Sequence, residues 1–337
     1  MNTKEIISKL IGGSDLSAEE AEQFMGEIAD GILFPIQSAA FLTALAVKGE
    51  TSDEIAGCAK AFRDRSLKVP HNQKIVFDCC GTGGDSSGSF NISTAVAFVV
   101  AACGIPTAKH GNRSVSSLCG SADVLEELGV KIGLKPKSAA TCLDELGICF
   151  IFAPFYHPAM KHAAPIRKEL GFRTVFNLLG PLLNPAETTH QIIGVPSMDI
   201  GRKLALTAYR LNNGKIRLLH NSEGLDELVL FGENWIISAD ENGVKEDRLD
   251  IGLVDGADSS SIKGGSANDN AAIIRSIFEG EKSLRRDTVV LNAAVGLVLV
   301  DAASDYKEGM KMAEETIDSG RVTRKLDKLI ELSNKLV

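Results

Sequence analysis

The chain has 337 residues, of which 44% are hydrophobic and 24% charged, and its formal net charge is −8. This composition is typical of a folded globular protein, and the length predicts two domains or one large domain with an appendage. The acidic balance argues against a nucleic-acid partner, which would require a surplus of cations, but it allows a local cationic pocket for an anionic small molecule.

Cysteine usage and hydropathy predict a cytoplasmic protein. The seven cysteines form no Cys-x-x-Cys pair and most lie in apolar runs, so we expect free thiols rather than disulfides. The N-terminus lacks the apolar core of a signal peptide. The most apolar stretches, residues 95–105 and 289–300, are shorter than the roughly 18 residues that a membrane span needs, so we expect no membrane partner.

The first seventy residues predict helices and no strand. Two capping boxes, Ser17 with Glu20 and Thr51 with Glu54, precede segments whose apolar residues recur with helical spacing. A further helix is expected after Pro35. These segments together predict a small helical unit.

After residue 70 the pattern alternates between strands and helices. It predicts strands at 74–78, 107–110, 149–152, 191–195 and 215–220, and helices at 91–103, 121–128, 138–146 and 201–212, followed by a helical tail from 269. Such alternation is typical of an α/β domain with a mostly parallel central sheet.

Residues 158–185 interrupt this alternation with several prolines and glycines. We expect this segment to leave the sheet and pack on the helical unit. The predicted organisation is a helical domain of residues 1–70 with a returning segment at about 160–185, and an α/β domain of residues 71–337. A small-molecule site is expected in the cleft between them.

The densest candidate chemistry is the segment DCCGTGGDSSGSFNIST at residues 78–94. Its glycines would let backbone N–H groups converge on one anion, and the helix expected near Asn91 would add oriented donors. A serine hydroxyl at such a helix start can also ligate magnesium that is shared with phosphate. The spacing is neither a P-loop nor a dinucleotide-binding fingerprint. The segment therefore predicts phosphate binding, and the alternative is a tight turn with an N-cap.

A second cluster, KHGNRSVSS at residues 109–117, brings three potential cations and three serines to the end of a short predicted strand. In a chain of negative net charge, this local reversal suits a second phosphate or one long polyanion. The alternative is a solvated basic loop.

Two further features are ambiguous when taken alone. The adjacent carboxylates of Asp226 and Glu227 could hold Mg²⁺ or simply face solvent. Pro165 predicts a helix start, which would put Arg167 in the first turn, where the helix dipole disfavours a cation. A local rule broken in this way points to an anionic ligand, and a structural salt bridge is the alternative.

These features, in this order, resemble the anthranilate phosphoribosyltransferases, a family of nucleoside phosphorylase-like phosphoribosyltransferases. The resemblance covers nearly the whole chain. It is carried by GTGGD at 81–85, FNIST at 90–94, KHGNRSVSS at 109–117, GSADVLEELG at 120–129, the stretch 152–185, GLDEL at 224–228 and RRDTVVLNAA at 285–294.

The resemblance implies a small helical domain plus a larger α/β domain, paired as a homodimer through the helical parts. It also implies Mg²⁺-dependent transfer of phosphoribosyl from phosphoribosyl diphosphate to the amine of anthranilate, in tryptophan biosynthesis, with two ions per site. The leaving diphosphate needs its charge neutralised, and a neutral aromatic amine needs no strong base. We therefore expect electrostatic and positioning catalysis without an assigned acid or base.

By position, the resemblance implies three sets of site residues. Anthranilate would be bound by Gly81, Asn112 and Arg167, with His110 and residues 155–160 lining its path. Mg²⁺ would be held by Ser93, Asp226 and Glu227. The contacts to phosphoribosyl diphosphate would come from Gly81, Gly84, Asp85, Ser89, Asn91, Ser93, Thr94, Lys109, His110, Gly111, Asn112, Arg113, Ser116, Ser117 and Ser121.

Two alternative functions stay open. A pyrimidine-nucleoside phosphorylase shares the fold, but it uses inorganic phosphate and does not need the metal pair at Asp226 and Glu227. A non-enzymatic homologue that binds nucleic acid would need a basic groove, against which the acidic balance and the intact motifs argue.

Overall fold

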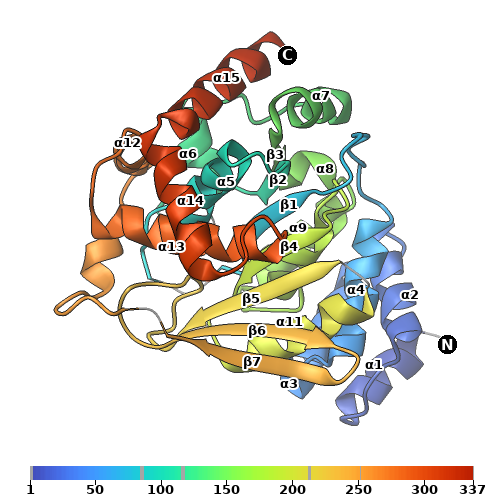
Figure 1. Ribbon diagram of the computed structural model, residues 1–337. Helices are drawn as coiled ribbons and strands as arrows, with labels where there is room; N and C mark the ends of the chain where they lie inside the picture. The colour runs from blue at the N-terminus through green and yellow to red at the C-terminus, as the bar shows by residue number, and fades with distance from the viewer. Residues whose placement is uncertain (1–2, 84–86, 115–117, 212–213, 251, 337) are drawn as a thin grey trace.

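The computed structural model describes residues 3–336 except 84–86, 115–117, 212–213 and 251. The described chain forms a unit of four N-terminal helices beside an α/β unit, and the N-terminus lies at the outer side of the helical unit (Figure 1). No helix among the described residues combines the length and the apolar composition that crossing a membrane requires.

The four N-terminal helices are α1 (Thr3–Ile11), α2 (Ala18–Ala29), α3 (Pro35–Lys48) and α4 (Ser52–Arg63). Both predicted capping boxes are present and start α2 and α4. In the second box, Glu54 is fully buried and also accepts hydrogen bonds from Leu16 N at 2.9 Å and Lys48 Nζ at 2.9 Å. The carboxylate that caps α4 therefore also ties α4 to the segment before α2 and to the end of α3.

The α/β unit is built on a seven-stranded sheet in the order β3-β2-β1-β4-β5-β6-β7. The first five of these strands are parallel, and β6 and β7 are antiparallel. The sheet is thus mostly parallel, as predicted. The strands are β1 (Phe77–Gly81), β2 (Thr107–Gly111), β3 (Ile148–Phe152), β4 (His190–Gly194), β5 (Lys215–Asn221), β6 (Asn234–Asp240) and β7 (Gly243–Leu249).

Helices and short 3-10 turns connect these strands and form the C-terminal part of the chain. They are α5 (Ile92–Ala102), α6 (Ser121–Glu127), α7 (Pro136–Leu146), α8 (Ala153–Tyr156), α9 (Met160–Leu170), α10 (Phe176–Leu179), η1 (Gly180–Leu183), α11 (Met198–Arg210), η2 (Ser259–Ile262), α12 (Ala267–Phe278), α13 (Leu284–Leu299), α14 (Tyr306–Asp318) and α15 (Arg321–Lys335).

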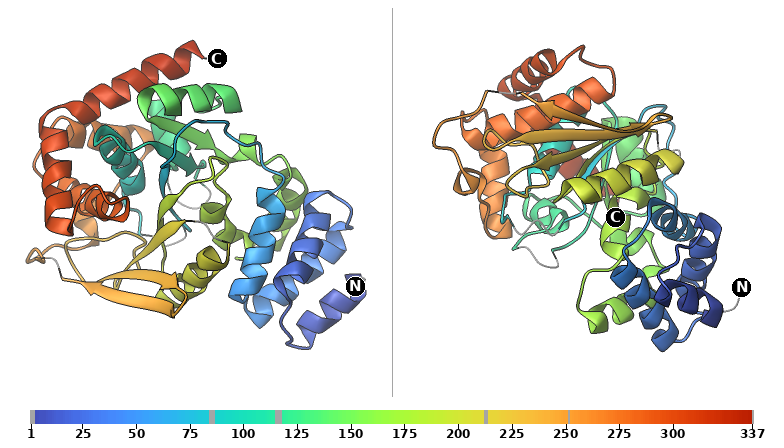
Figure 2. Two further views of the ribbon diagram at one scale, coloured as in Figure 1. Left: turned by 45° about the vertical axis from the view of Figure 1, so that its right-hand side comes forward. Right: turned by 90° about the horizontal axis from the view of Figure 1, so that it is seen from below.

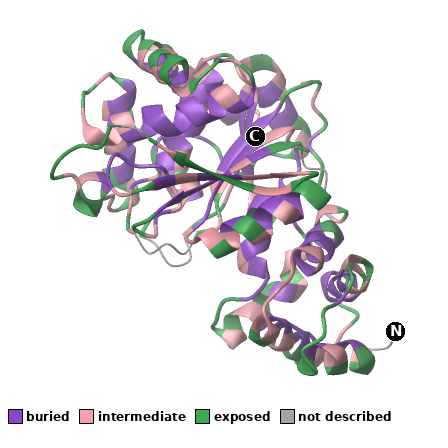
Figure 3. Cartoon of the chain, turned by 60° about the horizontal axis from the view of Figure 1, so that its bottom comes forward, coloured by how far each residue is buried: buried purple, intermediate pink, exposed green. Residues whose placement is uncertain are grey.

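Helices cover both faces of the sheet, so that an apolar core lies on each face. Because successive side chains of a strand point to opposite faces, neighbouring residues of one strand belong to different cores. On β4, Ile192 faces the core shared with α5 and α13, whereas Ile193 faces the core shared with α11 and the helical unit. The views in Figure 2 place α11 between the sheet and the helical unit, and α11 packs against α4. Figure 3 shows buried residues concentrated in the sheet and in the helices next to it.

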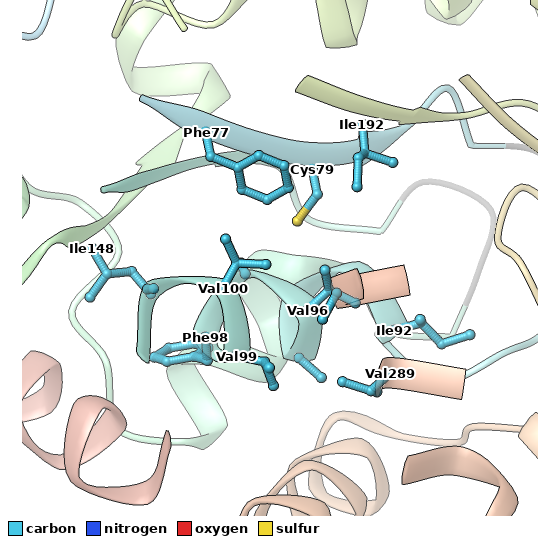
Figure 4. Packing of buried hydrophobic residues seen from close by; sticks show 14 of the residues in the cluster. Phe77, Cys79, Ile92, Val96, Phe98, Val99, Val100, Ile148, Ile192 and Val289 are labelled. Carbon is cyan, nitrogen blue, oxygen red and sulfur yellow. The ribbon is translucent and has the colours of Figure 1, made fainter. Parts of the chain in front are cut away.

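Helix α5 supplies the apolar layer beneath the candidate site. Val96 and Val100 of α5 face Phe77 and Cys79 of β1, and all four side chains are buried (Figure 4). Because this helix is apolar on nearly all sides, it is enclosed between the sheet and the C-terminal helices. Its N-terminus is thereby held at the carboxyl end of β1.

The segment from α9 to η1 packs on the helical unit. Helix α9 contacts α2 and α3, and α10 and η1 contact α4. The rings of Phe62 on α4 and Phe176 on α10 meet edge to face at 5.3 Å. The side chains of this segment belong to the same apolar cluster as the N-terminal helices.

The predicted start of a helix at Pro165 is wrong. Helix α9 begins at Met160, so Pro165 lies inside it and Arg167 lies in its last turn. Pro165 has no main-chain N–H and so cannot donate the helical hydrogen bond that another residue would donate there. A cation in the last turn agrees with the helix dipole, so the argument from a broken dipole rule fails.

Candidate functional site

The candidate site lies where the strand order reverses. The chain passes from β1 outwards to β2 and β3, and then returns to β4 on the other side of β1. In open α/β sheets, ligands bind at the carboxyl ends of the strands beside such a switch point. The glycine-rich turn follows β1 and Gly194 ends β4, so both lie at this point.

The acidic loop, residues 224–228 with Asp226 and Glu227, reaches this end of the sheet. Two glycines leave the space that it occupies. Gly81 and Gly194 are register partners on β1 and β4. A Cβ atom on Gly81 would overlap the carboxylate of Asp226, and one on Gly194 would overlap the main chain of Asp226. The absence of side chains at both positions therefore lets Asp226 lie directly against the glycine-rich turn.

Ser93 and Glu227 line one small cavity beside this contact, together with Cys79, Gly194 and Asn292. Its volume of about 10 Å³ is near the lower limit for a single water molecule. The structure thus brings all three predicted metal ligands to the same end of β1 and β4. Oxygen donors of this kind suit Mg²⁺, which takes few protein ligands and completes its shell with phosphate and water.

No three His, Cys, Asp or Glu side chains of the described residues are grouped as a ready-made metal cage. The donor set at this site is instead one hydroxyl and two carboxylates. This composition fits a hard cation that arrives with a phosphorylated substrate better than a permanently caged transition metal.

The glycine-rich turn is fixed on its far side by residues 262–264. Gly264 N donates to Gly88 O at 2.9 Å, and Phe90 N donates to Ile262 O at 3.0 Å. Ser89 forms a bridge with Lys263 between these bonds. Gly88 has a φ of 65°, a left-handed conformation that favours glycine, which explains a glycine in this part of the turn.

Asn91 immediately precedes α5, and both polar atoms of its amide are engaged. Its Nδ2 donates to Cys119 O at 3.1 Å, and its Oδ1 accepts from Asn270 Nδ2 at 2.9 Å. Asn91 therefore connects the turn to the loop before α6 and to α12. Thr94 is 1% exposed, and its Oγ1 has no hydrogen-bond partner among the described residues.

Lys109 lies in the interior behind the glycine-rich turn. Its Nζ donates to Cys79 O at 2.6 Å and lies 3.4 Å from Ser93 Oγ. The side chain is thus placed between β1 and the start of α5, and not on the surface of the basic cluster. A buried cation there makes the potential behind the turn more positive, which favours an anion in front of it.

His110 is uncharged, which corrects its description as a potential cation. Its Nε2 lies 3.2 Å from Nε2 of His157, and both residues are buried. Burial and the neighbouring His157 lower the pKa of His110 to about 3. Burial also lowers the pKa of His157 to about 4, so both imidazoles are neutral at pH 7.

Arg113 is an exposed cation that already has acidic partners. It pairs with Asp123 at 2.9 Å and with Glu126 at 2.6 Å, both on α6. Asp123 in turn accepts hydrogen bonds from Ser114 N and Gly120 N. A phosphate that used Arg113 would have to exchange with these carboxylates, so Arg113 at present stabilises the loop before α6.

The end of β2 closely approaches the start of α6. Ser121 Oγ donates to Asn112 O at 3.3 Å, and a Cβ atom on Gly111 would overlap this hydroxyl. These contacts hold three of the predicted ligand-binding residues close together: Gly111, Asn112 and Ser121. Four other predicted ligands lie outside the described residues: Gly84, Asp85, Ser116 and Ser117.

Arg167 projects from the last turn of α9 and lies over the ring of Phe176, 5.0 Å from its centroid. Burial lowers the pKa of Arg167, and no carboxylate of the described residues lies within 4.0 Å of it. A half-buried guanidinium without an acidic partner is the feature of this segment that fits an anionic ligand.

Three polar side chains that bond to the loops of the site could not be predicted from the sequence, because their contacts are tertiary. Asn292 binds the main chain of the acidic loop, and Asn270 orients Asn91. Arg173 donates to Gly83 O at 3.1 Å and connects the returning segment with the glycine-rich turn. Of these three residues, the sequence singles out only Asn292, a polar amide within the apolar run 289–300.

Two family models match the chain, and together they define its class. The glycosyl transferase family α/β domain matches residues 73–323, and the helical bundle domain of the same family matches residues 4–66. The chain therefore belongs to this glycosyl transferase family. The helical and α/β units described above correspond to its two domains.

Similarity to individual proteins narrows this class. The chain is 47% identical to anthranilate phosphoribosyltransferase from Desulforamulus reducens, over 99% of this chain and 97% of that protein. The crystal structure of the Thermus thermophilus anthranilate phosphoribosyltransferase is 38% identical with a TM-score of 0.91, and 98% of this chain and 99% of that chain are covered. The Saccharomyces cerevisiae enzyme in complex with PRPP and Mg is 26% identical with a TM-score of 0.90, over 99% and 98%.

Proposed function

We propose that the protein is an anthranilate phosphoribosyltransferase. It would transfer phosphoribosyl from phosphoribosyl diphosphate to the amine of anthranilate, giving N-(5-phosphoribosyl)anthranilate and diphosphate in tryptophan biosynthesis. The observation that carries this proposal is the close contact of Asp226 with Gly81 and Gly194, which brings the acidic loop against the glycine-rich turn. Full-length similarity to relatives of that name supports it.

In this reaction, the bond from C1 of the ribose to diphosphate breaks, and a bond from C1 to the anthranilate nitrogen forms. The turn and the start of α5 would hold the diphosphate, with Lys109 adding positive charge from behind. When bound, Mg²⁺ supplies further neutralisation of the leaving diphosphate, and Ser93, Asp226 and Glu227 would hold it, as two ions in our proposal.

Arg167 would orient the anthranilate carboxylate, and Asn112 and Gly81 would complete that subsite. The neutral imidazoles of His110 and His157 would line the approach as an uncharged hydrogen-bonding wall. The amine is already neutral near pH 7, and its surplus proton leaves to solvent after the new bond forms. Positioning and electrostatics therefore suffice, and no acid or base is assigned.

We further propose a cytoplasmic homodimer in which the helical domain comprises residues 1–70 with the returning segment at about 160–185, and the α/β domain the rest. Contacts of α9, α10 and η1 with α2, α3 and α4 support this division. The helical unit also exposes large apolar side chains, which suit a subunit interface: Ile11, Ile32, Phe34, Ile36 and Val47.

The test is to mix the protein with phosphoribosyl diphosphate, anthranilate and Mg²⁺ and to follow the loss of anthranilate fluorescence. We expect a loss that requires all three additions and is reduced about tenfold or more in Asp226→Asn at limiting Mg²⁺. The exposed ion-pair variant Arg202→Ala is the control and should behave as wild type.

A folded protein that leaves anthranilate unchanged would contradict the proposal. Cleavage of pyrimidine nucleosides that depends on inorganic phosphate and not on Mg²⁺ would instead identify a nucleoside phosphorylase. Tight, salt-sensitive binding of DNA at physiological ionic strength would support the nucleic-acid-binding alternative.

A further inference from the structure

We propose that Arg285 and Asn292, both on α13, are positioning residues for the two loops of the candidate site. Asn292 would fix the acidic loop through Leu228, and Arg285 would fix the glycine-rich turn through Lys263. The inference rests on the proposed function, because it assigns these loops to diphosphate and metal binding. It also assigns a role to the stretch RRDTVVLNAA at residues 285–294, which the site residues above leave without one.

The amide of Asn292 holds the acidic loop by both of its polar atoms. Its Nδ2 donates to Leu228 O at 2.7 Å, and its Oδ1 accepts from Leu228 N at 3.1 Å. The same Nδ2 donates to Thr288 O at 2.8 Å, one turn earlier in the helix. The amide is 1% exposed, so its orientation is fixed by these three bonds without competition from water.

This anchor is adjacent to the predicted metal ligands. Leu228 directly follows Glu227, and Asn292 lines the same small cavity as Ser93 and Glu227. A change in the Leu228 main chain would therefore shift the carboxylates of the acidic loop relative to Ser93. The expected functional effect is on metal affinity.

Arg285 supports the glycine-rich turn through one intermediate segment. Its Nη2 donates to Lys263 O at 2.9 Å. Lys263 is the bridge partner of Ser89, and Gly264 next to it donates to Gly88 O. Loss of the guanidinium would remove one of the bonds that hold this segment and would loosen its strand-like pairing with the turn. The expected effect is on phosphoribosyl diphosphate binding.

Helix α13 is a rigid link between the two anchors. Arg285 and Asn292 are seven residues apart, which is about two turns and about 10 Å along one side of a helix. The helix is buried over most of its length and packs against α5, α14 and β4 (Figure 1). It therefore carries both anchors on one packed element.

The experiment measures ligand binding apart from turnover. Binding of Mn²⁺, used as the probe metal, is followed by the electron paramagnetic resonance signal of free Mn²⁺ at saturating phosphoribosyl diphosphate. We expect Asn292→Ala to weaken Mn²⁺ binding about tenfold or more and to change the KM for anthranilate by less than about twofold. We expect Arg285→Ala to weaken phosphoribosyl diphosphate binding about tenfold, measured calorimetrically at saturating Mn²⁺.

Two matched controls test whether any lost anchor has the same effect. Arg275→Ala removes a bond from Nη2 to Leu128 O, and Asn334→Ala removes a bond from Nδ2 to Gly129 O, both outside the two loops. These controls should bind Mn²⁺ and phosphoribosyl diphosphate as wild type. Circular dichroism confirms folding, and Asn292→Ser replaces Asn292→Ala in the comparison if the alanine variant does not fold.

Folded variants of Asn292 and Arg285 that bind both ligands within about twofold of wild type would overturn the inference. So would control variants with losses as large as those of the two anchors. The proposed function fails separately, because it is contradicted only if the wild-type protein itself does not consume anthranilate.

Discussion

Arg167 is a half-buried cation that has no ion-pair partner among the described residues. Burial lowers its pKa, Phe176 covers one side of the guanidinium, and no carboxylate of the described residues forms an ion pair with it. A guanidinium that has lost part of its hydration gains more from a ligand carboxylate than an exposed one does. This makes Arg167 the strongest candidate for recognition of the anthranilate carboxylate.

We therefore predict that Arg167→Ala raises the KM for anthranilate about 10- to 100-fold, which corresponds to the loss of a charged hydrogen bond. The KM for phosphoribosyl diphosphate should change little. Steady-state kinetics with each substrate varied in turn provides the measurement, and Arg202→Ala serves as the control. An unchanged anthranilate KM would remove Arg167 from the proposed subsite.

The sequence can locate the parts of the candidate site in which one segment alone carries the chemistry. The glycine-rich turn and the acidic pair were predicted from composition and from the family resemblance, and the structure places Asp226 against Gly81. The charge state of His110 could not be predicted, because it depends on burial and on His157. The role of Asn292 likewise depends on a loop that lies far away in the sequence.

At the scale of secondary structure, local sequence motifs correctly predicted helix starts. The bounds of strands, which depend on pairing with distant segments, were predicted less well. Capping boxes fixed the starts of α2 and α4. The predicted first strand, at 74–78, lies three residues too early, because pairing with β4 extends β1 to Gly81. The hairpin of β6 and β7 was not predicted, although Asn242-Gly243 is a known turn signal.

Helices α2 and α4 approach so closely that one glycine becomes essential to their packing. A Cβ atom on Gly57 of α4 would overlap the carbonyl oxygen of Ala18 at the start of α2. Glycine within a helix costs about 1 kcal/mol relative to alanine, so close helix packing must compensate for its presence. The helical unit depends on this contact because α2 and α4 share the most extensive helix–helix contact within it.

We predict that Gly57→Ala lowers the free energy of unfolding by about 1–3 kcal/mol, the usual cost of overpacking, despite its better helix propensity. Urea denaturation followed by circular dichroism measures this change. Gly133→Ala is the control, since nothing lies within 4 Å of its added Cβ atom. Stabilisation by Gly57→Ala would show that the two helices are farther apart than described.

At the scale of the whole molecule, the exposed apolar side chains are unevenly distributed. Ile36 and Val47, at 79% and 84% exposure, lie at opposite ends of α3 in the helical unit. Their exposure to water is unfavourable in a monomer, whereas a partner subunit would bury them. The proposed homodimer would thus cover the helical unit and leave the carboxyl edge of the sheet open to substrates.

We predict that the wild-type protein has about twice its chain mass of 35.9 kDa in solution. The double variant Ile36→Glu with Val47→Glu should be monomeric at micromolar concentration, because the interface would have to bury two carboxylates. Sedimentation velocity distinguishes the two states. Leu253→Glu, an exposed leucine of the α/β unit, is the control, and a monomeric wild type would refute the proposed dimer.

The burial of His110 and His157 makes unfolding a proton-consuming process in acid. At pH 5, both imidazoles would be protonated in the unfolded chain, since an ordinary histidine titrates near pH 6.5, but both stay neutral in the folded protein. Each histidine therefore lowers the free energy of unfolding by about 1.4 kcal/mol per pH unit as the pH falls from 6.5 towards 4. The pair that lines the proposed substrate path thus also limits the acidity that the fold can tolerate.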